Sequence, residues 1–463
     1  MKSKYMILAM AISSVAILSQ TTQAQEGYPP QGYGTPPVGM YDPGFQGGGQ
    51  MSYADPAAAG YYHPGYGMNP AYQTAAYDPA VVGTEQTAYY GQQGLQPIAE
   101  GSEEEYEFIE NYSQVVGVAP KIFGGIEYLH VWRKGQSFEG SLLATSTDPA
   151  DESIIGAATT SSLFGMGREQ DTPRSGARLT GGIWLDDYQN WGVGGRGLAL
   201  EREVLGITAT TADYANLGHP FYNTNTSLND SIVISKPGVG NNSANNATSI
   251  IRNENNFYAA DLFITKHLWT KHANRWDFVT GYSYLQVEDA FSLNSTFTVR
   301  DGGGSIPQDT VVNFNDMFNT HNEFHGGQFG IMGELQDGPI TWRLLSKISI
   351  GQMNQQATIA GTYFEDSNLL DNEGIYARDS NSGSYSRSRF AFIPEFNIDM
   401  LYALTTNLDL KFGTTFIYVS DIATPGSIID PRIDPTGGTE PAFNFDTTDY
   451  WMLGINCGFD FHF

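Results

Sequence analysis

The stretch WMLGINCGFDFHF, residues 451–463, alternates with a period of two and decides the fold. Each of its odd-numbered residues is apolar, whereas its even-numbered residues are small or polar except for Met452. A strand with one apolar face and one small or polar face is what a barrel wall requires when lipid lies outside and water lies inside. The stretch therefore indicates a membrane-barrel strand, and a strand of a soluble sandwich is the alternative with similar alternation.

Aromatic side chains in this stretch favour the barrel over the sandwich. We interpret Trp451, Phe459, Phe461 and Phe463 as an assembly signal, because a terminal aromatic strand of this kind resembles the signal carried by outer-membrane proteins. The expected partners are the barrel-assembly machinery, which would recognise this strand, and the lipid of the outer membrane.

The same alternation recurs upstream. It is clear over residues 340–350, 390–402 and 408–418, where every second residue is apolar with few exceptions. Weaker alternation marks further candidate strands at residues 123–132, 176–185, 191–205, 256–269, 275–298 and 322–335. Together with residues 451–463 these segments predict an all-β fold with about ten strands, and twelve is the other count that the pattern allows.

Connection lengths support the barrel, because outer-membrane barrels combine short periplasmic turns with long outer loops. The short connections are residues 186–190, 270–274, 336–338 and 404–407. The long ones are residues 134–175, 206–255, 299–321, 363–384 and 423–449. Short and long connections alternate, so both chain ends are expected on the periplasmic side. The long segments are rich in Asn, Ser, Gly and Asp, and we expect them to be solvated outer loops.

Three parts of the chain are predicted. Residues 1–24 have the short basic start, apolar stretch and small residues of a signal peptide. Residues 25–120 form a Tyr-, Gly-, Pro- and Gln-rich tail that lacks the branched apolar side chains needed for a core, so we expect it to be disordered in the periplasm. Residues 121–463 are the barrel, because no later segment has the roughly 20 apolar residues of a spanning helix.

Composition excludes two classes of function. The chain has 23 Lys and Arg against 50 Asp and Glu, and neither Lys nor Arg occurs between Lys4 and Lys121. Binding to nucleic acid needs clustered positive charge, so no nucleic-acid partner is expected. Cys457 has no second cysteine to pair with, which excludes a disulfide or cysteine–zinc scaffold. We expect Cys457 to face lipid in the register of the last strand.

Residues 316–330, DMFNTHNEFHGGQFG, resemble a motif of a bacterial family of putative outer-membrane beta-barrel porins, the seventh so numbered. Further segments agree with this family in the same order: residues 347–351, 394–402, 416–420, 425–430 and 448–463. Thr424 stands where the family more often has Arg. The resemblance spans roughly residues 180–463 and implies an outer-membrane barrel with no established solute.

Charged residues between the lipid-facing ones are the candidates for a lumen site. If Phe390, Phe392 and Phe396 face lipid, the intervening residues point into the barrel. We predict these pore-lining residues: Arg343, Lys347, Arg389, Glu395, Asp399, Asp409, Lys411 and Asp460. They could tune ion selectivity, or they could form a salt-bridged core that fills the lumen. The interior of a barrel with about eight strands is already filled by side chains. A barrel of about ten strands therefore leaves little room for a wide channel.

The sequence contains candidates for two other kinds of site. His321 and His325 lie near Asp316, and a histidine with a carboxylate can activate water. No hydrolase motif surrounds them, so we interpret them as histidines of the barrel rim. Hard oxygen ligands for Ca²⁺ are present in the long segment 423–449 and just before it, namely Asp421, Asp430, Asp434, Glu440 and Asp446. Their spacing does not match an EF-hand, and we expect no metal and no cofactor.

The sequence thus predicts a single antiparallel transmembrane β-barrel in the outer membrane with a disordered N-terminal tail. Its expected role is porin-like, narrow passive exchange without catalysis. A non-conducting structural or surface-adhesion barrel that acts through its long outer loops is the alternative, and a surface hydrolase ranks below both. Whether the barrel forms a homo-oligomer is left open by the sequence.

Overall fold

The computed structural model describes residues 120–237, 244–271, 273–300 and 306–463. The predicted signal peptide and all of the predicted tail except Pro120 lie outside the described residues. No helix in the described part of the chain is long and apolar enough to cross a membrane.

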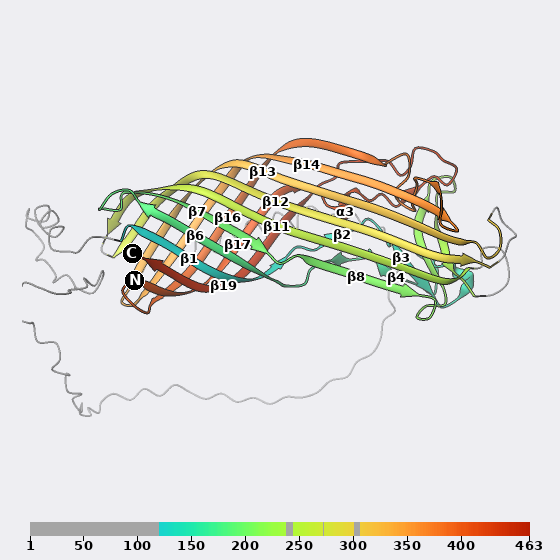
Figure 1. The fold of residues 1–463 in the computed structure, drawn as a ribbon, viewed down its shortest axis with the longest axis horizontal. Coiled ribbons are helices and arrows are strands. Elements are labelled where there is room, and N and C mark those ends of the chain that lie inside the picture. The colour runs from blue at the N-terminus through green and yellow to red at the C-terminus, as the bar shows by residue number, and fades with distance from the viewer. Residues whose placement is uncertain (1–119, 238–243, 272, 301–305) are drawn as a thin grey trace, which may run out of the picture. The chain divides into compact units, whose positions relative to one another are not determined.

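Ten antiparallel strands close into a ring (Figure 1). In the order in which they pair around the ring, they are β1 (Ile122–Arg133), β6 (Arg174–Trp184), β7 (Trp191–Leu200), β11 (Ala244–Lys271), β12 (Asn274–Val299), β13 (Val311–Asp337), β14 (Ile340–Glu365), β16 (Gly383–Ala403), β17 (Leu408–Ile422) and β19 (Thr448–His462). The ring closes because β1 pairs with both β6 and β19. The predicted all-β barrel of about ten strands is therefore confirmed, and each predicted strand corresponds to one strand of the ring.

Both described ends of the chain lie at one end of the barrel, which we call the terminus end. The backbone N–H groups of Lys121 and Ile122 donate to the carbonyl oxygen of Phe463, at 2.5 and 2.8 Å. The short connections between strands lie at the same end, as the alternation of loop lengths predicts. We call the opposite end, where the long connections lie, the head end.

Four neighbouring strands, β11, β12, β13 and β14, continue far beyond the ring toward the head end (Figure 1). The strand β8 (Glu203–Thr210) prolongs β7 along the same edge of β11, and the short strand β15 (Asn368–Asp371) pairs with the end of β14. The expectation that residues 206–255 and 299–321 are solvated loops is therefore wrong for residues 206–210, 244–255 and 311–321, which lie in β8, β11 and β13. The sequence does not reveal this extension, because many of its outward residues are polar while inward residues such as Phe291 and Phe318 are apolar, the reverse of the pattern in the lipid-facing part.

A second sheet packs inside the extended strands and forms, with them, what we call the head. It consists of β10 (Leu228–Ser235), β9 (Leu217–Asn223), β3 (Leu143–Ser146) and β4 (Thr160–Phe164), with β18 (Arg432–Ile433) beside β9. A separate two-stranded ladder joins β2 (Gln136–Ser137) to β5 (Arg168–Glu169). The short helices η1 (Pro149–Asp151) and α3 (Pro425–Ile428) lie in the same long connections.

The head has an apolar core, so the long connections are not simply solvated loops. Buried side chains from the second sheet, such as Leu143 and Leu217, join Phe291 and Phe318 of the extended strands and Tyr376 of the connection after β15 in one cluster. Burial of this much apolar surface stabilises the connections as a packed unit.

The outward face of the ring carries a band of apolar side chains. Toward the head end, this band ends near Phe390, whose side chain is 68 % exposed. The change from apolar to polar residues takes place within one row of cross-strand neighbours. The last apolar row reads across β11, β12, β13, β14 and β16 as Leu262, Tyr282, Gly327, Ile350 and Phe392. Cys457 is exposed on this outward face, in agreement with the predicted register. Such a band is what contact with hydrocarbon requires.

Candidate functional site

A layer of paired charges lies in the lumen at the level of the apolar band. The Glu127 carboxylate, which is 2 % exposed, accepts hydrogen bonds from Arg178 at 3.0 and 2.5 Å and from Lys411 at 3.0 Å. Lys411 also lies 3.2 Å from Asp399 and 3.7 Å from Asp460. Each buried charge therefore has a partner of opposite sign, which is what burial of a charge requires.

A second group of charges joins this layer. Arg196 donates to Asp261 at 2.9 Å and to Glu395 at 2.5 and 2.7 Å. Lys347 lies 2.7 Å from Asp261 and 3.1 Å from Glu395. Asn397 donates to Glu395 at 2.7 Å and accepts from Arg178 at 3.4 Å, so the two groups form one network.

Most of the predicted pore-lining residues belong to this network. The structure brings together Arg343, Lys347, Glu395, Asp399, Lys411 and Asp460. Asp409 lies at its edge, 3.9 Å from His462. Arg389 is exposed on the part of β16 that continues beyond its pairing with β17, so its prediction as a lumen residue is wrong. The alternation gave the correct face of the strand but not the height at which the lumen ends.

Sequence reasoning missed Glu127, Arg178, Arg196 and Asp261. All four lie in segments that were predicted as strands, on positions whose neighbours along the chain are apolar or small. An ionisable residue at membrane depth is rare and faces the interior. That signal was available for the two arginines, because each lies between apolar or small residues in a segment predicted as a strand.

An apolar layer lies above the charge network, toward the head end. It contains large buried side chains from the wall strands, among them Phe257, Phe324, Met353, Ile417 and Tyr450. All the ring strands except β6 contribute to it: Leu129, Val131, Leu198, Leu200, Phe257, Leu285, Val287, Phe324, Met353, Ala391, Ile393, Ile417, Val419, Ile422, Tyr450 and Met452. Each of these side chains is at most 5 % exposed, so no water-sized opening runs beside them and they fill the lumen at this level.

A third lumen layer is polar and lies between the apolar layer and the core of the head. Asp289 accepts hydrogen bonds from Gln136 at 2.6 Å and from Asn255 at 2.7 Å. Burial raises the pKa of Asp289 to about 6, and the positive charge of Arg133 opposes this shift. Thus three layers of side chains succeed one another along the axis of the barrel.

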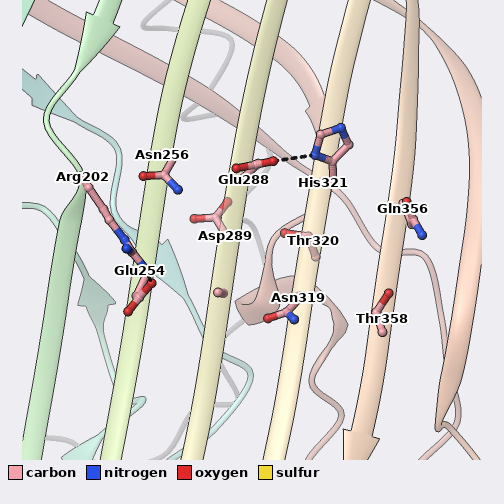
Figure 2. Close-up of a pocket in the computed structure, with 11 residues that line it drawn as sticks. Arg202, Glu254, Asn256, Glu288, Asp289, Asn319, Thr320, His321, Gln356 and Thr358 are labelled. Carbon is pink, nitrogen blue, oxygen red and sulfur yellow. Dashed lines mark hydrogen bonds and ion pairs between the residues drawn. The ribbon is translucent and has the colours of Figure 1, made fainter.

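A hollow of about 420 Å³ lies on the outward face of the extended strands, just beyond the apolar band (Figure 2). Its walls come from β11, β12, β13 and β14 and from Arg202 in the turn before β8. The lining residues are Arg202, Glu254, Asn256, Glu288, Asp289, Ala290, Asn319, Thr320, His321, Gln356 and Thr358. Nearly all of these are polar, which distinguishes the hollow from the lipid-facing band below it.

The charges at the hollow are paired. Glu254 forms ion pairs with Arg202 and Arg252, and His321 Nδ1 lies 3.0 Å from Glu288. His325 lies lower on β13, where it contacts Tyr282 at 2.5 Å and Glu323 at 3.4 Å.

The histidine pair considered from the sequence cannot act with Asp316. His321 and His325 share the outward face of β13, as their spacing on a strand predicts, but Asp316 is buried on the inward face. Among the acidic residues that the sequence offered as Ca²⁺ ligands, Asp430 pairs with Arg432 at 2.8 Å, and Asp434 accepts from Thr436. Within the described ranges, no group of three or more His, Cys, Asp or Glu side chains is placed to hold a metal ion.

Comparison with known proteins finds one matching family and several solved β-barrel structures that are similar to this chain. A model of the family described as "Putative beta barrel porin-7 (BBP7)" matches residues 123–463. Among solved structures, the chain is similar to the outer membrane protease OmpT from Escherichia coli, with 9 % identity and a TM-score of 0.36 over 76 % of this chain and 100 % of that one. It is also similar to the Pseudomonas putida toluene transporter TodX, with 8 % identity and a TM-score of 0.20 over 74 % and 90 % of the two chains. No curated protein matches the sequence.

Proposed function

Since the chain belongs to the family of putative beta barrel porins numbered seven and is an outer-membrane β-barrel, we propose that it is a closed, non-conducting barrel that acts at the cell surface through its head. In this proposal the head end lies outside the cell and the terminus end faces the periplasm. The barrel anchors the head, and the head makes the contacts that matter for function.

The apolar layer in the lumen is the observation that carries this proposal. Phe257 and Phe324 are fully buried and belong to a cluster to which nine of the ten ring strands contribute. An ion or a hydrated solute would have to lose its water to pass such a layer, and an unpaired charge in an apolar environment is strongly disfavoured. The charge network below this layer does not stabilise a passing ion, because its charged groups are already paired with one another.

The packed head supports a role at the surface. The described parts of its connections pack around a core of their own, and Tyr376 is fully buried between the second sheet and the extended strands. A head that served only as a set of solvated loops around a pore mouth would not need this core. A rigid, exposed unit on a membrane anchor suits an architectural or adhesive role.

Planar-bilayer recording of the purified, folded protein tests the proposal. We expect no discrete conductance steps from the wild type, in bilayers where an open porin gives clear steps. A double variant Phe257→Ala, Phe324→Ala should leak more than the wild type, because it removes two of the largest side chains from the apolar layer. Reproducible steps from the wild type would overturn the closed barrel.

Narrow passive exchange is the second candidate, and the description of the family as porins favours it. It would require the apolar layer to open in some state of the protein. Steps in the bilayer experiment whose ion selectivity changes in a Lys347→Gln variant would support this candidate, because Lys347 lies in the charge network. We assign no catalysis to either candidate. Turnover of peptides or lipids that is lost in a His321→Ala variant would contradict that assignment.

A further inference from the structure

We propose that the outward hollow at Ala290 binds the saccharide headgroup of a glycolipid that lies in the same membrane leaflet as the head end. This inference goes beyond the closed barrel and rests on the proposed function only in placing the head outside the cell. It is carried by the position of the hollow, by its construction and by the chemistry of its walls.

The position of the hollow follows from the register of the extended strands. The boundary row above the apolar band reads Ala260, Tyr284, His325, Gln352 and Phe390. The next two rows are polar apart from Tyr258: Tyr258, Gln286, Glu323, Asn354 and Ser388, followed by Asn256, Glu288, His321, Gln356 and Ser386. Headgroups of the surrounding lipids lie directly beyond their hydrocarbon, so the hollow faces headgroups rather than acyl chains or open solvent.

A small residue creates the hollow. In the third polar row, Ala290 pairs with Glu254 on one side and with Asn319 on the other. Glu288, two residues earlier on β12, projects on the same outward face. The methyl group of Ala290 is therefore shorter than the side chains around it, and Figure 2 shows the labelled Glu254, Glu288 and Asn319 among the residues that line the hollow.

The walls present the groups that recognise sugar hydroxyls. Asn256, Asn319 and Gln356 offer amides, and Thr358 offers a hydroxyl, so the hollow has both donors and acceptors. Glu254 is not free to hold a cation by itself, because it pairs with Arg202 and Arg252, and Glu288 lies 3.0 Å from His321 Nδ1. Arg202 is the one arginine among these lining residues and is already paired, so the amide-rich wall suits a polyhydroxylated group better than an isolated phosphate, which would favour unpaired cations.

The anchoring of the ligand follows from the geometry of the membrane. A glycolipid places its sugar at a fixed height beside the apolar band, so its effective concentration at the hollow exceeds that of a free saccharide. The acyl chains of the same lipid would contact the exposed apolar residues below, among them Leu262, which is 66 % exposed.

Thermal unfolding of the full-length protein in mild detergent tests the proposal. The probes are mixed micelles that contain a glycolipid with a glucosamine-disaccharide headgroup, mixed micelles that contain an anionic phospholipid, and the free disaccharide. We expect the glycolipid to raise the unfolding midpoint, because a ligand that binds only the folded state stabilises it. The free disaccharide should require at least about tenfold higher concentration for the same shift.

Two matched variants make the test specific. Ala290→Leu fills the floor of the hollow without removing a polar group and should abolish the midpoint shift. Ala360→Leu places the same side chain on the outward face of β14, opposite Met317 and outside the hollow, and should keep the shift. If Ala290→Leu does not fold, the double variant Gln356→Ala, Thr358→Ala replaces it and should also lose the shift.

Three results would overturn the inference. They are an unchanged shift in the hollow variants, an equal shift with anionic phospholipid, and no shift with the glycolipid in the wild type. An equal potency of the free disaccharide would overturn the assignment to a lipid. All these measurements use micelles, so they do not depend on conductance or on the orientation of the barrel in the cell. Bilayer recording tests conductance separately, and surface labelling of intact cells tests the orientation.

Discussion

Asp316 on β13 accepts a hydrogen bond from the backbone N–H of Ala377, with 2.7 Å between Oδ1 and N. The same carboxylate accepts from the N–H groups of Ile375 at 3.1 Å and Tyr376 at 3.0 Å. One side chain of the wall thus fixes the segment that carries Tyr376 into the core of the head. The motif residue Asp316 therefore links the barrel to the head.

Replacing Asp316 by Ala should destabilise the head. The change leaves three buried N–H groups without acceptors, and each such group costs about 1–3 kcal/mol. Asp316→Asn keeps one carbonyl oxygen and should cost less. Hydrogen exchange of the amides of residues 375–377 measures the effect. Equal protection in the wild type and in Asp316→Ala would contradict the proposed link.

The stability of the head should depend on pH through His219. Its ring is fully buried and contacts the carbonyl oxygen of Leu142 and the hydroxyl of Ser295, both at 2.7 Å. Burial lowers the pKa of His219 to about 4. The unfolded state therefore binds more protons between about pH 4 and 6.5, so stability is lost as the pH falls through this range.

The loss should reach about 2 kcal/mol at pH 5 relative to pH 7. The measurement is the difference in unfolding free energy between the wild type and His219→Gln at several pH values. This difference should shrink as the pH falls, because the glutamine does not titrate. A difference that stays constant between pH 7 and 5 would show that His219 does not carry the dependence.

Much of the barrel could be predicted from the sequence because lipid imposes a strict rule on the outward residues. Phe390, Phe392 and Phe396 identified one face of β16, and Glu395 and Asp399 consequently lie in the lumen. Beyond the hydrocarbon this rule ceases, and outward residues such as Gln356 look like loop residues. The extension of the strands and the packed head therefore could not be read from alternation alone.

The candidate site within the membrane could be predicted in part from the sequence, whereas the site beyond the hydrocarbon could not. The charge network was predicted in part, because Lys347 and Lys411 occupy inward positions of strands with clear alternation. The hollow at Ala290 could not be predicted, because it depends on which outward residues of β11, β12 and β13 are cross-strand neighbours. That register was not available from the sequence, in which residues 206–255 were expected to be a loop.

Arginine at Phe396 should destabilise the barrel by about 2–4 kcal/mol, the cost of a cation on the lipid face near mid-membrane. Phe396 faces outward and pairs with Ser346 and Phe416 within the apolar band. Ser388→Arg is the matched control, because Ser388 lies on the outward face of the same strand but in the polar rows. Unfolding by denaturant in lipid bilayers measures both. Similar costs for the two variants would show that the band does not end where the register places it.

Deletion of Phe463 should weaken the seam between β1 and β19. Phe463 exchanges backbone hydrogen bonds with Ile122, at 2.9 Å as donor and 2.8 Å as acceptor, and also accepts from Lys121. Its loss removes these bonds and one exposed aromatic ring at the terminus end. The yield of heat-modifiable barrel in the membrane fraction measures the effect, with deletion of a single residue inside the predicted tail, Tyr61, as a control for expression. A normal yield would contradict both the seam and the predicted assembly signal.

Glu127 should be the most sensitive position of the charge network. Its carboxylate accepts from Arg178, Lys411 and Asn456, the last at 2.8 Å. Glu127→Gln leaves two buried cations without their main partner, and removal of one member of a buried ion pair costs about 3–5 kcal/mol. Glu334→Gln is a milder control, because Glu334 is half-buried and shares Arg343 with Asp460.

A double variant separates the charge from the packing at this position. Glu127→Gln combined with Arg178→Met removes both members of the pair and replaces the arginine by an apolar chain. If the uncompensated cation causes the loss, the double variant should recover much of the stability that Glu127→Gln loses, and the coupling energy should be large. The measurement is the free energy of unfolding by denaturant. If the losses of the two single variants simply add in the double variant, Glu127 and Arg178 do not act as a pair. The network would then only fill the lumen with polar side chains.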